Sequence, residues 1–169
     1  MPGRNDQTIR IQRLTPDDAD LFRTIRLEAL RTTPLAFCAS HDVEAAEPAA
    51  AFAGRLQRNA VFGAFAGDDV IGMAGFSLSE KNPGRGLVWG MYVRPDRQGQ
   101  GIGARLLAAV MDHARDLVET LGLSVVAEND GARALYERHG FRETGSQSRH
   151  LPDDGRMIRE ILMDLSLRS

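Results

Sequence analysis

Three alternating glycines mark the clearest candidate for a binding site in this sequence. Gly99, Gly101 and Gly103 lie between an apolar run that ends at Val93 and a long amphipathic segment that begins at Ile102. The first N–H groups of a helix have no partner within the helix and lie at the positive end of its dipole. Glycines keep side chains away from these donors, so an anion can approach them. The spacing therefore predicts a phosphate-binding loop at this junction.

The spacing excludes one common phosphate site and leaves another open. No Gly-Lys-Ser or Gly-Lys-Thr follows the glycines, which argues against a nucleotide-hydrolysing P-loop. Gly99, Gly101 and Ala104 satisfy the relaxed dinucleotide fingerprint, with Glu128 as its ribose-binding acid. However, the loop follows antiparallel strands, and only one more helix comes after the long one. A dinucleotide-dependent oxidoreductase is therefore the weaker alternative.

Two spaced motifs resemble those of the GCN5-related N-acetyltransferases. The first, which includes the glycine loop, is Val93-x-Pro95-x-x-Gln98-x-x-Gly101-x-Gly103. The second, in the order and at the distance typical of that family, is Asn129-x-x-Ala132-x-x-Leu135-Tyr136-x-x-x-Gly140-Phe141. The resemblance covers about residues 8–165. It implies an acetyl-CoA-dependent enzyme that acetylates the primary amine of a small molecule or amino acid by direct attack on the thioester.

The resemblance also implies roles for individual residues. The backbone of Met91, Tyr92 and Val93 would bind the pantetheine arm of acetyl-CoA as an added strand, where this strand separates from its parallel neighbour. Asn129 would contact the pantetheine, and Tyr136 would protonate the departing sulfur. Seven residues at about 100° each return to within about 20° of the starting direction, so both side chains can share one line of a helix. The cofactor would be bound by the loop residues Gln98, Gly99, Gln100, Gly101, Ile102, Gly103 and Ala104, with the backbone amides of 99–104 holding its pyrophosphate.

The acceptor side of the site is less defined. The resemblance places the first helix and the segment after it along one wall of the acceptor pocket. The polar and aromatic candidates there are Arg26, Glu28, Phe37, Ser40, His41 and Glu44. The expected acceptor is a small-molecule or peptide amine, and the sequence is also compatible with a homodimer.

No residue can be assigned as the general base. Some relatives carry a glutamate on the strand before the asparagine, where this chain has Ser124. Neutralising a lysine-like amine of pKa about 10.4 at pH 7 costs roughly 4.6 kcal/mol, so a base is useful. Glu44 and Glu160 are candidate carboxylates, but the sequence favours a proton route through ordered water. The missing carboxylate also leaves open a non-catalytic sensor that binds acyl-CoA.

Composition narrows the class of protein. The chain has 169 residues, 43% apolar and 26% charged, which predicts one globular domain over residues 1–169. A net charge of -2, with both signs well mixed, gives no indication of nucleic acid as a partner. Cys38 is the only cysteine, and the four histidines are scattered, so neither a disulfide nor a metal site is expected. No apolar run reaches about 18 residues, which favours a cytoplasmic protein without a membrane partner.

The same patterns predict the elements that position these residues. Helices are expected from Thr15 to Thr32, over 49–58, from Ile102 to a closing Gly122, and over 129–139. The strand, helix and strand around the glycine loop predict parallel pairing of their two strands. The fold class is therefore α+β: a mixed, mostly antiparallel sheet, a central parallel βαβ unit and about four helices. The predicted strands cover 9–14, 61–66, 70–79, 87–93, 123–127, 141–148 and 157–165.

Overall fold

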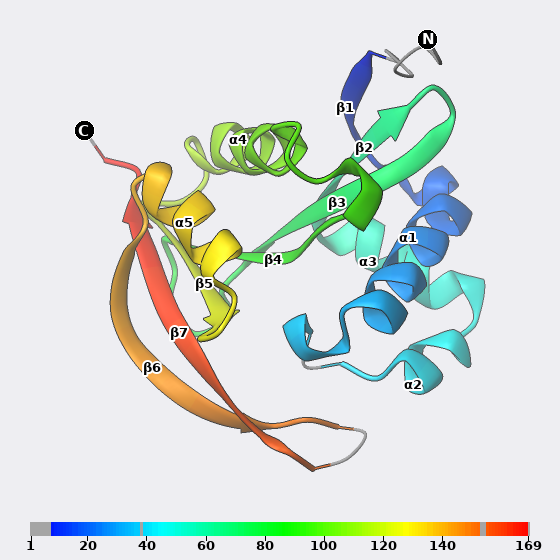
Figure 1. Ribbon diagram of the computed structural model, residues 1–169. Helices are drawn as coiled ribbons and strands as arrows, with labels where there is room; N and C mark the ends of the chain where they lie inside the picture. The colour runs from blue at the N-terminus through cyan, green and yellow to red at the C-terminus, as the bar shows by residue number, and fades with distance from the viewer. Residues whose placement is uncertain (1–7, 38, 153–154, 169) are drawn as a thin grey trace, which may run out of the picture.

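The computed structural model describes residues 8–37, 39–152 and 155–168, so Cys38 lies outside the described residues. These residues form a seven-stranded sheet in the order β1-β2-β3-β4-β5-β7-β6, with helices on both faces (Figure 1). The strands are β1 (Ile9–Arg13), β2 (Ala60–Ala66), β3 (Asp69–Leu78), β4 (Arg85–Val93), β5 (Thr120–Val126), β6 (Arg142–His150) and β7 (Met157–Ser166). The α-helices are α1 (Ala19–Thr32), α2 (His41–Ala45), α3 (Ala49–Arg58), α4 (Ile102–Ala114) and α5 (Asp130–Arg138). The predicted α+β class and mixed sheet are confirmed.

Strands β4 and β5 separate along their length. Within the described residues they pair in parallel at Arg85, Gly86 and Leu87 of β4, opposite residues 120–122 of β5. All other strand pairs in the sheet are antiparallel. Gly90 in the unpaired half of β4 has a φ of +66°, and the β3–β4 register shifts nearby, so β4 bends away from β5. The parallel pairing predicted from the sequence is therefore confirmed, but it is short.

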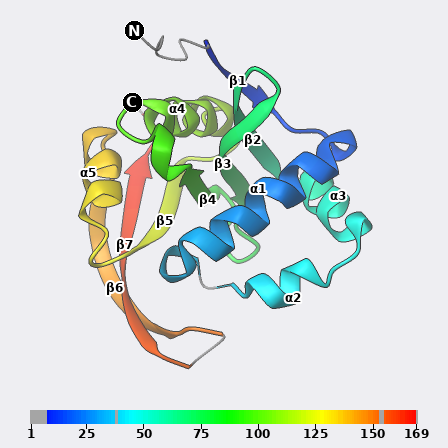
Figure 2. The ribbon, with the colours of Figure 1, turned by 45° about the vertical axis from the view of Figure 1, so that its right-hand side comes forward.

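Two hydrophobic cores hold the diverging strands from opposite faces. Helices α4 and α5 lie on one face of the sheet, and α1 and α3 lie on the other (Figures 1 and 2). The first core includes Leu106 and Leu121, and the second includes Phe22 and Phe52, whose rings meet edge to face at 5.9 Å. Each such side chain stabilises the fold by about 1.5–3 kcal/mol when fully buried. The separation of β4 from β5 is therefore flanked by two packed layers.

The predicted end of the long helix is wrong. The helix expected to close at Gly122 ends at Ala114, and Gly122 lies inside β5. The Arg85 side chain passes over this glycine to bind Asp164 of β7, with Nη2 2.7 Å from Oδ1 and Nη1 3.0 Å from Oδ2. A Cβ on Gly122 would collide with the Arg85 guanidinium. The glycine therefore makes room for an ion pair across three strands and does not cap a helix.

The segment between α1 and α3, which the sequence pattern left unassigned, contains the additional short helix α2. Its N-cap is Ser40, whose hydroxyl accepts a hydrogen bond from the Val43 amide at 3.3 Å. The predicted helix over 49–58 coincides with α3. The described residues thus hold five α-helices, one more than the sequence pattern suggested.

Candidate active site

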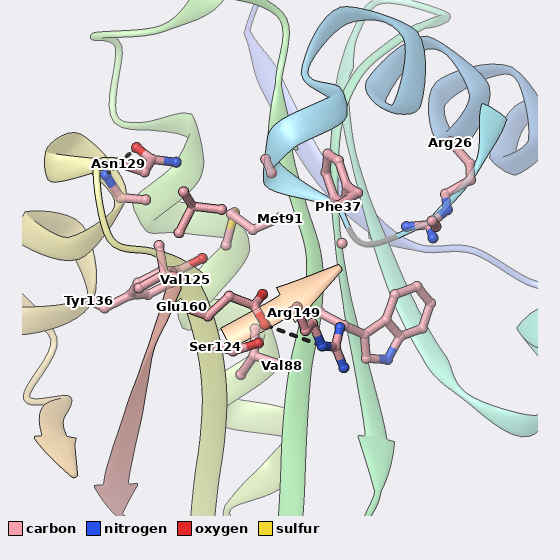
Figure 3. Close-up of a pocket in the computed structure, with 16 residues that line it drawn as sticks. Arg26, Phe37, Val88, Met91, Ser124, Val125, Asn129, Tyr136, Arg149 and Glu160 are labelled. Atoms are coloured by element: carbon pink, nitrogen blue, oxygen red, sulfur yellow. Dashed lines mark hydrogen bonds and ion pairs between the residues drawn. The ribbon is translucent and has the colours of Figure 1, made fainter. Parts of the chain in front are cut away.

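A pocket of about 240 Å³ lies where β4 and β5 separate (Figure 3). Its lining residues come from α1, from the segment after it, from the second half of β4, and from β5, α5, β6 and β7. Three of them carry charge: Arg26, Arg149 and Glu160. Trp89 and Phe37 add aromatic surface. A polar, partly aromatic pocket therefore forms at the gap in the sheet.

The pocket connects the two faces of the sheet. Val125 of β5 belongs to the core beneath α4 and α5, as does Tyr136 of α5. Val126 points to the opposite face because side chains alternate along a strand, and Glu160 is its register partner on β7. Figure 3 shows the Glu160 carboxylate between Tyr136 and Arg149. Tyr136 and Glu160 therefore approach the pocket from opposite faces of the sheet.

The glycine loop leads into α4 and leaves open space above its backbone. Gly99 has a φ of +80° and Gly101 a φ of +77°, a conformation that other residues rarely adopt. A Cβ added at either position would meet nothing within 4 Å. The Arg105 amide donates the first helical bond to the Gly101 carbonyl at 3.1 Å, so the amides at 102–104 lie ahead of the bonded ladder. This geometry suits an anion such as a phosphate.

Two residues of the loop motif have structural explanations. Gln98 donates from Nε2 to the Val93 carbonyl at 3.1 Å, which fastens the loop to the end of β4. Gly103 differs from the other two glycines because an added Cβ would lie 3.4 Å from the Leu135 side chain of α5. The Ile102 side chain is buried in the core beneath α4 and α5. Gly103 therefore permits close packing of α4 against α5.

Among the residues expected to bind pantetheine, Met91 and Asn129 line the pocket. The Asn129 Oδ1 accepts a hydrogen bond from the Ala132 amide at 3.2 Å and so caps α5. The Tyr92 side chain lies in the core on the α1 face, and its hydroxyl donates to Glu28 at 2.9 Å. Tyr92 and Val93 do not line the pocket, and the Val93 carbonyl is the acceptor of the Gln98 hydrogen bond.

Tyr136 lies at the inner wall of the pocket and is 6% exposed. Its ring meets Phe141 edge to face, with centroids 5.8 Å apart. Burial raises the pKa of the Tyr136 hydroxyl well above its ordinary value, since the anion would lose its solvation. The hydroxyl therefore stays protonated and can donate a hydrogen bond into the pocket.

Glu28, which the resemblance placed on the acceptor wall, is not among the residues that line this pocket. Its carboxylate accepts bonds from Arg94 Nε at 3.0 and 3.1 Å and from the Tyr92 hydroxyl at 2.9 Å. The hydrogen bond to Glu28 raises the pKa of the Arg94 guanidinium. Glu28 therefore ties α1 to the end of β4, beside the glycine loop. No local sequence pattern indicates this contact, because it joins residues 66 positions apart.

Glu44 does not line the pocket but binds Arg26, which does. Its Oε1 accepts from Arg26 Nε at 3.0 Å, and its Oε2 accepts from Nη2 at 3.1 Å. The Arg26 guanidinium also lies 5.4 Å from the centre of the Phe37 ring, and both side chains line the pocket. Since Arg26 occupies both carboxylate oxygens, Glu44 is a poor candidate for the general base. The other two candidates of this wall, Ser40 and His41, are not among the lining residues.

Glu160 is the buried carboxylate of the pocket. The residue is 4% exposed, and its Oε1 accepts from Gln147 Nε2 at 3.0 Å and lies 3.3 Å from Arg149 Nε. Both partners are on β6, a polar strand in which the sequence pattern identified no functional residue. The only signal was their spacing, because Gln147 and Arg149 are two positions apart and therefore share a face of the strand.

Two negative findings apply to the described ranges 8–37, 39–152 and 155–168. They contain no group of three or more His, Cys, Asp or Glu side chains that could hold a metal ion. They also contain no helix that is both long and apolar enough to cross a membrane.

Comparison with known proteins shows the family to which this chain belongs. The model of the Acetyltransferase (GNAT) family matches residues 24–141, and the chain belongs to that family. N-alpha-acetyltransferase RimI of Mycobacterium tuberculosis is 40% identical over 106 residues, which are 61% of this chain and 66% of the relative. Ribosomal protein bS18-alanine N-acetyltransferase of Escherichia coli is 37% identical over 86 residues, which are 50% of this chain and 58% of the relative. The matches thus span less than two thirds of either relative.

Solved structures share the whole fold. The ribosomal-protein-S18-alanine N-acetyltransferase of Escherichia coli superposes with a TM-score of 0.71 at 25% identity, over 96% of each chain. The structure of yncA from Salmonella typhimurium, which contains its cofactor acetyl-CoA, superposes with a TM-score of 0.76 at 21% identity, over 95% of each chain. The GNAT fold inferred from the two motifs is therefore confirmed.

Proposed function

We propose that this protein transfers the acetyl group of acetyl-CoA to the primary amine of a small molecule or an amino acid. The observation that carries the proposal is the pocket at the separation of β4 and β5, which Tyr136 and Glu160 approach from opposite faces. Membership of the acetyltransferase family supports acetyl transfer over the dinucleotide alternative.

The donor would bind along β4 and the glycine loop. The pyrophosphate fits the space above Gly99 and Gly101, where a Cβ would meet no atom within 4 Å. The pantetheine would add to the unpaired half of β4, whose backbone around Met91 faces no β5 residue in the register of the described strands. The Asn129 side-chain nitrogen can contact the arm, since Oδ1 already caps α5. The thioester then lies in the gap between the faces.

The reaction would be a direct displacement at the thioester carbonyl. The neutral amine nitrogen forms a bond to the carbonyl carbon, the carbon–sulfur bond breaks, and the amine loses one proton. Tyr136 would donate a hydrogen bond to the departing sulfur and supply its proton, which suits a hydroxyl whose pKa is raised by burial. Phe141 packs against the tyrosine ring and keeps the hydroxyl in place.

A second acceptor class is the α-amine at the N-terminus of a protein. The names of the two relatives, at 40% and 37% identity, favour it. An α-amine has a pKa of about 7.7–8.0, so neutralising it at pH 7 costs roughly 1 kcal/mol and needs less help from a base.

The test is a thiol-release assay with acetyl-CoA and a matched panel of amines. The panel contains alanine, alaninamide, a polyamine, a peptide with a free N-terminus, and the same peptide blocked at its N-terminus. Release with alanine or another small amine supports the proposal, and release confined to the free peptide supports the second class. Stabilisation by acetyl-CoA without release for any amine would instead indicate an acyl-CoA sensor.

A further inference from the structure

We infer that Glu160 accepts the proton of the acceptor ammonium, so that the site takes amines that arrive in their charged form. The inference rests on the proposed function. It gives a role to a buried carboxylate on β7 that lies outside both sequence motifs. It also replaces the proton route through water that the sequence alone favoured.

The first argument is the position of Glu160 relative to Tyr136. Glu160 shares a sheet face with its register partner Val126, whereas Tyr136 packs with Val125 beneath α4 and α5. A thioester in the gap between β4 and β5 would thus have Tyr136 on one face and Glu160 on the other. An amine attacks the carbonyl carbon from one side while the sulfur leaves toward another. Glu160 is therefore on the side where the amine loses its proton.

The second argument is the way Glu160 is held. A buried carboxylate loses solvation and is retained only with hydrogen-bonding or charged partners. Gln147 donates to Oε1 at 3.0 Å, and Arg149 Nε lies 3.3 Å from the same oxygen. Both contacts reach Glu160 from β6 and involve the same oxygen, so the buried carboxylate has polar partners that compensate for its lost solvation. An ionised carboxylate at the pocket wall attracts an ammonium and can accept its proton.

The third argument comes from the other charged and titratable groups that face the pocket. Arg149 on β6 already contacts Glu160, and Arg26 on α1 is held by Glu44. Tyr136 on α5 stays protonated because burial raises its pKa. Glu160 is therefore the carboxylate among the described lining residues.

The proton balance is complete without another reactant. Glu160 takes one proton from the ammonium, and the free nitrogen attacks the thioester carbon. The carbon–sulfur bond breaks, the sulfur takes the Tyr136 proton, and the nitrogen loses its second proton to solvent. The proton on Glu160 then returns to Tyr136 through solvent as the products leave. The net products are the acetylated amine, coenzyme A as a thiol, and one proton released to solvent.

The test compares Glu160→Gln with the wild type on acceptors of different basicity. We expect kcat/KM for an alkylamine to fall by about a hundredfold or more, with the acidic limb of its pH profile now following the pKa of the amine. An alkoxyamine is already neutral at pH 7, so its loss should be at least about tenfold smaller. The stabilisation of the variant by acetyl-CoA should be unchanged. A merely structural role for Glu160 would lower both rates alike.

The matched control is Glu143→Gln, which removes an exposed carboxylate from β6 whose partner is Arg133. It should leave both acceptors unaffected. If Glu160→Gln does not fold, the wild type still decides the question. With Glu160 as the base, the acidic limb keeps one apparent pKa across an amine series, and with water it follows the pKa of each amine.

Two results would overturn the inference in distinguishable ways. If Glu160→Gln retains alkylamine turnover within about threefold, or the wild-type limb follows the amines, the proton goes elsewhere while the proposed function stands. If the wild type releases no thiol with any amine but is stabilised by acetyl-CoA, the proposed function fails, and this inference fails with it.

Discussion

Gly101→Ala provides the sharpest test of the donor site. Gly101 is the N-cap of α4, with a φ of +77° and open space around an added Cβ. Alanine in this left-handed conformation costs about 1–2 kcal/mol whether or not a ligand binds. A chain of this size loses about 2–4 °C of Tm per kcal/mol, so the free variant should melt roughly 2–8 °C lower. A bulkier, β-branched residue would add strain and confuse the result.

Gly155→Ala is the matched control. Gly155 lies between β6 and β7, has a φ of +67°, and also has nothing within 4 Å of an added Cβ. The control therefore carries the same kind of backbone strain at a position outside the glycine loop. The two variants should differ in their response to the ligand and not in the direction of their own Tm change.

The ligand response can be estimated from linkage. Acetyl-CoA at 100 times its Kd stabilises the wild type by about 2.7 kcal/mol, which raises Tm by roughly 5–11 °C. If the Cβ of Gly101→Ala weakens binding tenfold, the same concentration stabilises by about 1.4 kcal/mol, and the Tm shift is halved. Differential scanning fluorimetry with and without acetyl-CoA measures both shifts. Equal shifts in Gly101→Ala, Gly155→Ala and wild type would refute the assignment of the pyrophosphate to this loop.

Three further predictions concern separate parts of the molecule. Tyr136→Phe keeps the packing against Phe141, so steady-state kinetics should show kcat lowered by about 10²–10⁴ with an unchanged Kd for acetyl-CoA. If kcat falls by less than about threefold, Tyr136 serves only in packing. Glu28→Gln weakens the link from α1 to Arg94, so KM for acetyl-CoA should rise several-fold while kcat is nearly constant. A changed KM for the acceptor would instead indicate that Glu28 contacts the acceptor. Burial, and secondarily a nearby arginine, lower the pKa of His113 from 6.5, so protonation favours the unfolded chain. The stability that neutral His113 contributes is fully present above about pH 6.5 and is lost as the pH falls through the lowered pKa. Urea unfolding at several pH values should show that the free energy of unfolding depends less on pH in His113→Gln than in the wild type. Equal pH dependence in the two proteins would contradict this prediction.

Local elements were predicted well because their causes are local. The helix over 49–58 and the hairpin of β2 and β3 follow from apolar periodicity and from turn residues within a few positions. The prediction failed at Gly122, where the reason for a glycine is the Arg85–Asp164 ion pair on neighbouring strands. The sequence pattern likewise did not indicate the contact of Glu28 with Arg94 at the end of β4. In both cases the decisive partner comes from a distant part of the sequence.

The distinction between local causes and distant partners also separates the two halves of the candidate site. The proposed donor half consists of two contiguous segments, the end of β4 with the loop leading into α4, and the start of α5. A contiguous segment can carry a motif because its geometry is set by its own backbone, as with the left-handed Gly99 and Gly101. The acceptor half is assembled from α1, the segment after it, β6 and β7.

No local pattern could place the acceptor half, because its geometry depends on the strand order. Strand β7 lies between β5 and β6, so Glu160 has Val126 on one side and Gln147 on the other. A register shift of one residue would turn Glu160 to the opposite face, toward the core beneath α4 and α5. The donor half can therefore stay constant while the acceptor half changes by substitutions on β6 and β7. Acceptor specificity in this chain should accordingly respond to changes at Arg149 and Gln147 that leave acetyl-CoA binding intact.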